Sequence, residues 1–186
     1  MANLPIRRYQ GEVCLVETEQ DLARVQADLL EENIVGFDTE TRPAFTKGVH
    51  HLPCLVQVAT ARTVYLFPLR RQEVFPVLAG LLAETRIVKV GIGLADDLRS
   101  LREVFAFDTA NVFDPGSIAR RRGLEQSGLR NLAGIFLGFR IPKGKQTSNW
   151  AAAHLSQAQI TYAATDAWAC RELYLHYRGL GWINAV

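Results

Sequence analysis

The stretch VGFDTETRP, residues 35–43, starts as a buried strand and ends in two acidic residues. Val35 and Phe37 belong to a continuous apolar run, which is typical of a strand in the core of a sheet. Asp38 and Glu40 follow at the point where that run ends. Because side chains alternate along a strand, we expect both carboxylates on the same face. The rest of the chain has to explain why two like charges stand so close together.

Two explanations of this acidic pair differ in what they require. A solvated strand end or a cap needs no ligand, and it is the ordinary interpretation of an isolated Asp-x-Glu. A bound cation is the alternative, because it offsets both the mutual repulsion of the carboxylates and the cost of removing them from water. Further acidic residues at suitable places along the chain would favour the cation.

Hydrophobic patterns on both sides of this strand predict an α/β fold. Alternating or continuous apolar residues predict strands at 12–17, 33–40, 54–60, 63–69 and 86–91, with a short extended segment at 111–115. Apolar residues at helical spacing predict helices at 18–32, 73–84, 95–105 and 128–138, a short helix from Pro115, and a last helix from Ser156 to about Tyr177. Thr18, Asp114 and Ser156 are the expected N-caps of the first, the short and the last of these helices. The strands gather early and the helices late, so we expect a mixed central sheet flanked by helices.

Length and composition indicate one globular domain over residues 1–186. Of these residues, 48% are hydrophobic and 22% are charged. The net charge of +2 neither demands nor excludes nucleic acid, so an anionic partner would have to be held locally. The sequence shows no signal peptide, and no apolar run approaches the roughly 18 residues of a membrane span, so we expect a cytoplasmic protein without a membrane partner. Cys14, Cys54 and Cys170 lack metal-binding spacing and are expected as reduced thiols.

A second acidic pair follows another predicted strand. In KVGIGLADDLRSL, residues 89–101, a strand ends at Gly91 and a helix begins near Ala95, with Asp96 and Asp97 in its first turn. Acids in a first turn interact favourably with the helix dipole, worth roughly 0.3 to 1 kcal/mol, which is a sufficient explanation for this segment alone. A dinucleotide-binding loop is not indicated, because the third glycine of that motif is missing and an acid there would repel a pyrophosphate.

The last predicted helix carries the most specific feature. In SQAQITYAATDAWACRELY, residues 156–174, Tyr162 and Asp166 stand four residues apart. This spacing places them on one helical face, with Cβ atoms roughly 5 to 6 Å apart. A half-buried tyrosine hydrogen-bonded to Asp166 is the simple alternative. The alanines between and after them leave space for another chain segment or a substrate to approach.

Taken together, these features form an ordered set of four carboxylates. A strand-end Asp-x-Glu, a helix-start Asp and a late helical Asp, without a Cys/His cluster, are hard oxygen ligands that select Mg²⁺ or Mn²⁺ over zinc. Two such ions about 3.5 to 4 Å apart clamp the attacking and leaving oxygens of an in-line phosphoryl displacement. The residues themselves therefore indicate phosphoryl chemistry with two divalent cations.

The same segments carry a resemblance to a known family. The chain resembles the DEDD-type 3′–5′ exonucleases of the tyrosine subclass, which have a ribonuclease H-like fold. The resemblance covers roughly residues 12–178, and Tyr-x-x-x-Asp separates this subclass from relatives with a histidine one residue earlier, where this chain has Thr161. The matching segments, in the family's order, are GFDTETRPAFTKG (36–48), LVQVAT (55–60), VYLFPL (64–69), KVGIGLADDLRSL (89–101), SNW (148–150) and YAATDAWA (162–169).

The resemblance implies a role for each acidic group. Asp38, Glu40 and Asp166 would hold the first metal ion, and Asp38 would bridge to the second. Either Asp96 or Asp97 fits the remaining position. Asp97 is preferred, because the family acid is followed four residues later by an apolar residue, as this one is.

Tyr162 is expected to orient the attacking water rather than to remove its proton. A phenol with an ordinary pKa near 10 is a poor general base at neutral pH. A bound metal ion lowers the pKa of a ligand water by several units, so it is the better source of the nucleophile.

Contacts to a nucleic acid need cations for phosphates and surfaces for bases. The resemblance places Thr39 and Thr41 against the terminal nucleotide. Lys143 and Lys145 are the preferred phosphate contacts, because their loop directly precedes SNW. Gln57, polar within an apolar strand, is either a substrate contact or a satisfied buried amide. Other cations that meet phosphates or remain solvated are Arg42, Lys47, Arg120, Arg121, Arg122 and Arg130.

Two further residue types near the motifs leave alternatives open. Trp150 either packs between helices or stacks on a base. His50 and His51 are expected as loop residues near the substrate, because no second ligand pair stands at zinc spacing.

The resemblance also implies attack at chain ends, with release of 5′-mononucleotides from DNA or RNA that has a free 3′ end. It leaves the choice between DNA and RNA open, because readout of a 2′-hydroxyl depends on one or two local contacts. Two alternatives are an exoribonuclease specialised in RNA trimming and a catalytically idle nucleic-acid-binding module on the same fold. Loss of an acid would mark the idle module, and all four acids and the tyrosine are present.

Overall fold

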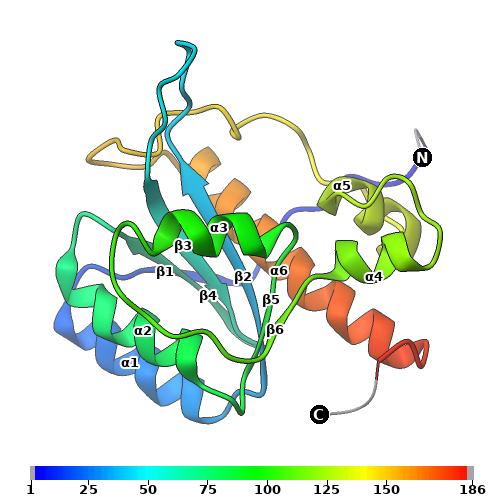
Figure 1. Ribbon diagram of the computed structural model, residues 1–186, viewed down its shortest axis with the longest axis horizontal. Helices are drawn as coiled ribbons and strands as arrows, with labels where there is room; N and C mark the ends of the chain where they lie inside the picture. Colours follow the sequence, from blue (N-terminus) through cyan, green and yellow to red (C-terminus); the bar gives the residue numbers. More distant parts are fainter. Residues whose placement is uncertain (1–2, 184–186) are drawn as a thin grey trace.

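A mixed sheet of six strands lies at the centre of the described part of the chain, residues 3–183 (Figure 1). This computed structural model leaves residues 1–2 and 184–186 of the predicted domain outside the described residues. The strand order is β1-β4-β3-β2-β5-β6, which confirms the prediction of a mixed sheet. The strands are β1 (Glu12–Leu15), β2 (Ile34–Thr41), β3 (Pro53–Ala59), β4 (Thr63–Pro68), β5 (Val88–Val90) and β6 (Val112–Phe113).

Strand directions change in the middle of the sheet. β3 runs antiparallel to both β2 and β4, whereas β1 pairs with β4, β5 with β2, and β6 with β5 in parallel. β2 is thus an inner strand, and its Asp38 lies opposite Gln57 of β3. The register between β2 and β3 shifts between Glu40 and Thr41, just before the loop that joins the two strands. The acidic residues therefore lie near the end of an inner strand, next to a hairpin.

Helices cover both faces of this sheet. The predicted N-caps are confirmed, because the side chains of Thr18, Asp114 and Ser156 each accept a hydrogen bond from a first turn. Within residues 3–183, no helix combines the length and apolar character needed to cross a membrane. The helices are α1 (Glu19–Leu30), the 3₁₀ turn η1 (Gln72–Val74), α2 (Phe75–Ala83), α3 (Leu94–Leu101), α4 (Pro115–Arg121), α5 (Leu129–Leu132), the π-helical turn η2 (Ala133–Leu137) and α6 (Gln157–Gly179).

Two predicted helices differ from the structure. The helix expected at 95–105 ends at Leu101, and the chain turns so that the Phe105 ring stacks on Phe75 with 4.8 Å between centroids. Burial of this aromatic pair outweighs one more helical turn. The helix expected at 128–138 is α5 followed by the wider π-helical turn η2, because this segment packs against α6 rather than standing alone.

The two faces of the sheet pack against different helices. On one face, apolar side chains of α1, α2 and α3 meet Phe37 of β2 and Phe67 of β4 in one core cluster. On the other face, α6 packs on β3 and β4 through its alanines. Figure 1 shows α1, α2 and α3 on the near side of the sheet, with α6 crossing behind it. The fold is therefore a layered α/β structure whose longest helix runs past the end of β2.

Small residues bring α6 close to β2. A Cβ atom at Gly36 would lie 1.9 Å from the carbonyl oxygen of Ala167, a separation that real contacts do not reach. The face of α6 toward the sheet carries Ala163, Ala164 and Ala167, all fully buried. This close packing carries Asp166, on the same helix, to the acidic end of β2.

Candidate active site

Three carboxylates meet near the end of β2. One oxygen atom from each of Asp38, Glu40 and Asp166 lies within 4.8 Å of the other two. Asp38 and Glu40 come from alternate positions of β2, and Asp166 comes from the facing helix α6. The prediction that the first two share a face is therefore confirmed. Within residues 3–183, none of the three forms an ion pair.

The fourth acid, Asp97, lies beside this cluster rather than in it. Its Oδ1 accepts a 3.1 Å hydrogen bond from the Thr39 hydroxyl of β2. Gly93, with a φ of 67°, caps α3 in the left-handed region and lets the chain turn into the helix that carries Asp97. Asp96 faces solvent and pairs with Arg99 at 3.0 Å. The geometry thus favours Asp97 over Asp96 as the acid that faces the site.

Burial and mutual repulsion make the charged form of these carboxyl groups unfavourable. Burial, and then the charges of Asp166 and Asp97, raise the pKa of Asp38 well above its ordinary value. Burial, and then the charge of Asp38, likewise raise the pKa of Glu40. Burial raises the pKa of Asp97 to about 6. One Asp166 oxygen, Oδ1, is buried without a hydrogen-bond partner in the described part of the chain. The arrangement therefore favours a bound cation.

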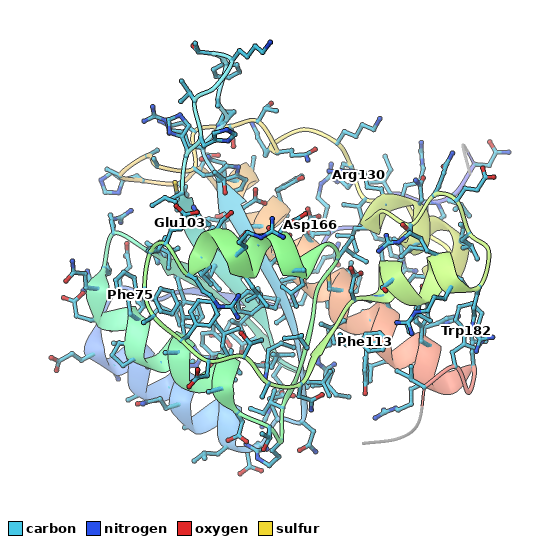
Figure 2. The ribbon with its side chains drawn as sticks, in the orientation of Figure 1. Phe75, Glu103, Phe113, Arg130, Asp166 and Trp182 are labelled. Atoms are coloured by element: carbon cyan, nitrogen blue, oxygen red, sulfur yellow. The ribbon has the colours of Figure 1, made fainter. Side chains whose placement is uncertain are left out.

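Tyr162 lies one helical turn before Asp166 and is held from two sides. Nη2 of Arg130, in α5, donates a 2.9 Å hydrogen bond to the Tyr162 hydroxyl. Figure 2 shows Arg130 and Asp166 reaching toward the same region. The Trp150 ring is buried, with its centroid 6.0 Å from that of Tyr162, so it packs in the core rather than offering a free stacking face. Burial, and then the charge of Asp166, raise the pKa of Tyr162, so the phenol is still harder to deprotonate at neutral pH.

Comparison with known proteins shows which family this chain belongs to. Residues 13–178 match a family model described as 3′-5′ exonuclease. The chain belongs to the 3′–5′ exonuclease family. The matched region contains all four acids and the tyrosine, and its extent agrees with the residues expected from the sequence.

Three relatives of this exonuclease domain show how far the similarity extends. The chain is 33% identical over 164 residues to ribonuclease D of Gluconacetobacter diazotrophicus, covering 86% of this chain and 41% of that protein. It is 28% identical over 189 residues to the bifunctional 3′-5′ exonuclease/ATP-dependent helicase WRN of Mus musculus, covering 96% of this chain and 14% of that protein. The crystal structure of the Aedes aegypti Nibbler EXO domain has a TM-score of 0.81 at 22% identity and covers 93% of this chain and 91% of that one.

These relatives confirm the ribonuclease H-like fold that was expected from the sequence. The exonuclease domain spans less than half the length of both sequence relatives.

The polar residues around the acids of the exonuclease domain have two different positions. Thr39 and Thr41 follow the acids along β2 and are half-buried, so they reach the edge of the site. Gln57 is fully buried, and its Nε2 donates a 3.4 Å hydrogen bond to Glu40. This burial favours the buried-amide alternative, with Gln57 supporting the Glu40 carboxylate, although its Oε1 has no hydrogen-bond partner in residues 3–183. The cause of the burial is the strand register, which buries Gln57 under α6.

A cavity of about 430 Å³ opens beside Tyr162. Lys143 and Lys145, the preferred phosphate contacts, both line it. The SNW segment ties their loop to the start of α6, where Gln159 donates a 3.1 Å hydrogen bond to the Ser148 hydroxyl. The structure therefore brings these two lysines next to the tyrosine of the site.

A third cation of this cavity, Arg8, was not among the residues expected from the sequence. The N-terminal segment lies along α6, because the Tyr9 amide donates a 3.0 Å hydrogen bond to Thr165. The Arg7 amide also donates a 3.0 Å hydrogen bond to the carbonyl of Arg140. These contacts join distant parts of the chain without any periodic pattern, so the sequence carries no signal that would have indicated Arg8.

The remaining candidate cations are Arg42 and Lys47 in the loop between β2 and β3, and Arg120, Arg121 and Arg122 in α4 or at its end. His50 and His51 lie in the same β2–β3 loop, as expected. The loop lies at the acidic end of β2 (Figure 1). The α4 cations hydrogen-bond to Ser117 and Ser127 or stack over the Trp182 ring. Of these cations, Arg42 lies only two residues after Glu40, at the start of the β2–β3 loop.

Proposed function

We propose that this exonuclease domain hydrolyses the 3′-terminal phosphodiester bond of DNA or RNA with two divalent cations, Mg²⁺ or Mn²⁺, and releases 5′-mononucleotides. The observation that supports it best is the meeting of Asp38, Glu40 and Asp166 oxygens within 4.8 Å of one another. Such a cluster is unfavourable unless it is protonated or binds cations. Membership of the 3′–5′ exonuclease family favours the cations.

The donor set fits Mg²⁺ or Mn²⁺. Carboxylate oxygens are the ligands that these hard cations prefer, and the buried Asp166 Oδ1 has no hydrogen-bond partner in residues 3–183. Asp38, Glu40 and Asp166 would hold one ion, and Asp38 with Asp97 the second. When bound, the ions supply an activated water and offset the charge that develops on the leaving oxygen.

Arg130 determines what the Tyr162 hydroxyl is free to do. Because this hydroxyl accepts a hydrogen bond from Arg130, its own hydrogen is left for one other oxygen, and the Asp166 carboxylate one turn later is a neighbour that attracts it. In this proposal Tyr162 donates to the attacking water or to a non-bridging oxygen of the scissile phosphate, which fixes the direction of attack. The raised pKa of Tyr162 keeps that hydrogen in place at neutral pH.

Cations beside the acidic cluster suit the phosphates of a substrate. Lys143, Lys145 and Arg8 line the cavity next to Tyr162. In this proposal they neutralise phosphate charge, while the β2 segment at Thr39 and Thr41 contacts the terminal nucleotide. Contacts to phosphate and sugar carry no base sequence, so they suit an enzyme that shortens strands of any sequence.

Degradation of strands labelled at the 5′ end tests the proposal. We expect a ladder of products shortened from the 3′ end, and release of 5′-mononucleotides, with Mg²⁺ or Mn²⁺ but not with EDTA. Asp38→Asn is expected to lower the rate by about 10³-fold or more, because it removes a ligand of both ions. The matched control Asp96→Asn changes an exposed acid on α3 and should leave the rate within about twofold.

Circular strands and strands with a blocked 3′ end complete the experiment, and both should persist. Turnover that survives EDTA, or equal cleavage of circular and linear strands, contradicts the proposal. Absence of any degradation would instead indicate a nucleic-acid-binding module. Comparison of an RNA strand with the matching DNA strand separates a general exonuclease from one specialised in RNA trimming.

A further inference from the structure

The loop between β2 and β3, residues 42–52, exposes apolar side chains in a way that the rest of the fold does not explain. Phe45 is 89% exposed, and Val49 and Leu52 are 41% and 44% exposed. Figure 1 shows this loop projecting beyond the sheet, away from the core clusters. Phe45 and Val49 line the same groove, and exposed apolar surface gathered beside a candidate active site is typical of a binding surface.

The loop and the segment that faces it carry basic side chains but no acidic ones. The loop contains Arg42 and Lys47, and no Asp or Glu occurs between residues 41 and 72. The facing segment, which carries Lys143 and Lys145, lies in a second stretch without any acid, residues 126–165. The chain as a whole has 19 Asp and Glu residues, so their absence from both stretches leaves a locally cationic surface suited to an anionic chain.

A groove of about 390 Å³ runs between these two segments. Arg42, Phe45 and His51 line one wall, and Thr147 and Asn149 line the other. The groove therefore joins a cation, an aromatic face and small polar groups, which is the combination that binds the backbone and the bases of single strands.

Both walls of the groove begin at the candidate active site. Phe45 follows Glu40 by five residues, so it lies at most about 18 Å away along the chain. On the other wall, Asn149 follows Ser148, which Gln159 of α6 holds three residues before the tyrosine of the site. A strand whose 3′ end reaches the carboxylates would thus have its preceding nucleotides within reach of the groove.

We propose that residues 42–52 form a stacking arm for the single-stranded part of the substrate, upstream of the bond that is cut. The base of an upstream nucleotide lies on the Phe45 ring, and Arg42 and Lys47 contact the neighbouring phosphates. This inference rests on the proposed exonuclease function and adds the class of strand that the site accepts. Because a base inside a duplex is stacked on both of its faces, the arm selects 3′ ends whose upstream bases are unpaired over duplex ends.

A pair of substrates of different length tests the stacking arm. The long one is a single-stranded 20-mer, and the short one is the p-nitrophenyl ester of thymidine 5′-monophosphate, which cannot reach the loop. For Phe45→Ala we expect KM for the 20-mer to rise about tenfold, which corresponds to the loss of one base stack. Hydrolysis of the short ester should stay within about twofold, and Phe45→Trp should keep the wild-type KM.

The matched control is Leu30→Ala, which removes a 74% exposed apolar side chain from α1. It should change neither the KM for the 20-mer nor the hydrolysis of the short ester. Anisotropy of a fluorescent 20-mer in EDTA measures how tightly the domain binds the strand when no hydrolysis takes place. There Phe45→Ala should weaken binding about tenfold, and Lys47→Ala should reduce the salt dependence by about one counterion.

The possible results separate this inference from the proposed function. An unchanged KM and unchanged anisotropy for Phe45→Ala overturn the stacking arm even if the domain is an exonuclease. An equal loss on both substrates also overturns it, because the effect would then lie in the catalytic centre. Lack of turnover by the wild type, together with weaker binding by Phe45→Ala, refutes the exonuclease function and supports the arm.

Discussion

Arg130 combines three features that set it apart from a surface phosphate contact. Its Nη2 donates to the Tyr162 hydroxyl at 2.9 Å, and its Nε is buried without a partner in the described residues. Its charge also lowers the pKa of Asp166 and so opposes the effect of burial, which is larger. A cation that contacts the tyrosine and acts on the neighbouring carboxylate is expected to position Tyr162 for the proposed reaction.

A double-mutant cycle tests this role of Arg130. We expect Arg130→Gln to lower kcat by about 10²-fold with little change in KM, because the Tyr162 hydroxyl loses its fixed orientation. Tyr162→Phe should have at least the same effect. The double variant should be no slower than Tyr162→Phe alone, since Arg130 acts through the hydroxyl that this variant lacks. Steady-state kinetics with saturating Mn²⁺ provides the measurement.

Two variants show whether Arg130 only holds the fold together. Arg130→Lys keeps a donor and should recover part of kcat, while Arg121→Gln on α4 should behave as wild type. Effects that add fully in the double variant, or a rise in KM with unchanged kcat, would refute positioning through Tyr162 and indicate a direct phosphate contact instead.

At the scale of elements, the site depends on how close α6 lies to β2. Asp166 reaches the other carboxylates because Gly36 of β2 leaves room for the helix backbone at Ala167. A methyl group at this position collides with backbone, which cannot move without shifting the whole helix. We therefore expect the distance between α6 and β2 to affect the rate of the proposed reaction as well as the packing of the fold.

Gly36→Ala is expected to lower the rate strongly while the protein still folds. Overpacking at this contact costs about 1 to 3 kcal/mol of unfolding free energy, and the displaced helix carries both Asp166 and Tyr162 away from β2. We expect weaker binding of Mn²⁺ and a rate at least about 10²-fold lower at a temperature where the variant is still folded. Calorimetric titration of Mn²⁺ and thermal unfolding check the two effects separately.

Gly80→Ala is the matched control for this change. Gly80 lies in α2, where an added Cβ meets nothing within 4 Å, so the variant should keep its activity and gain up to about 1 kcal/mol of stability. Wild-type metal affinity and rate in Gly36→Ala would show that the close approach of α6 has no part in the site.

Local patterns predicted the elements that carry the acids, but not all of their contacts. The two-residue period of β2 placed Asp38 and Glu40 on one face, and the capping box at Ser156 fixed the start of α6. The burial of Gln57 depends on the register of β2 with β3, which one strand's sequence does not determine. The partner of Arg130 depends on α5 packing against α6, a tertiary contact without a repeating pattern.

At the scale of the whole molecule, the carboxylate cluster makes stability depend on pH and on metal. Burial raises the folded-state pKa of Asp97 and Asp166 to about 6, from 3.8, and it also raises the pKa of Asp38 well above its ordinary value. Groups with a raised folded-state pKa bind more protons in the folded than in the unfolded protein. Their contribution is therefore fully present below about pH 4 and is lost as the pH rises through 6 and beyond.

Without metal, the folded protein should lose stability as the pH rises, and Asp38→Asn should reduce that loss of stability. In EDTA at pH 7.5, we expect the variant to unfold about 3 to 6 °C above wild type, because asparagine removes a carboxyl group whose ionisation is opposed by burial and then by the charges of Asp166 and Asp97. At pH 4 the two should unfold at similar temperatures, since the carboxyl groups are then protonated. Mn²⁺ at 100 times its Kd should stabilise wild type at pH 7.5 by about 2.7 kcal/mol, and the variant far less.

The unfolding temperatures of wild type and variant have to be compared below pH 8. Above that pH, the buried Lys89 changes the stability of the protein in the opposite direction. Burial lowers the pKa of Lys89 to about 8, so its contribution to stability improves as the pH rises from 8 toward 10.5. Asp96→Asn is the control, since this exposed acid should show neither the gain in EDTA nor the loss of the Mn²⁺ effect. An Asp38→Asn variant that is less stable than wild type in EDTA at pH 7.5 would mean that neither burial nor the neighbouring carboxylates make ionised Asp38 unfavourable in the folded protein, and the argument for bound cations would lose its physical basis.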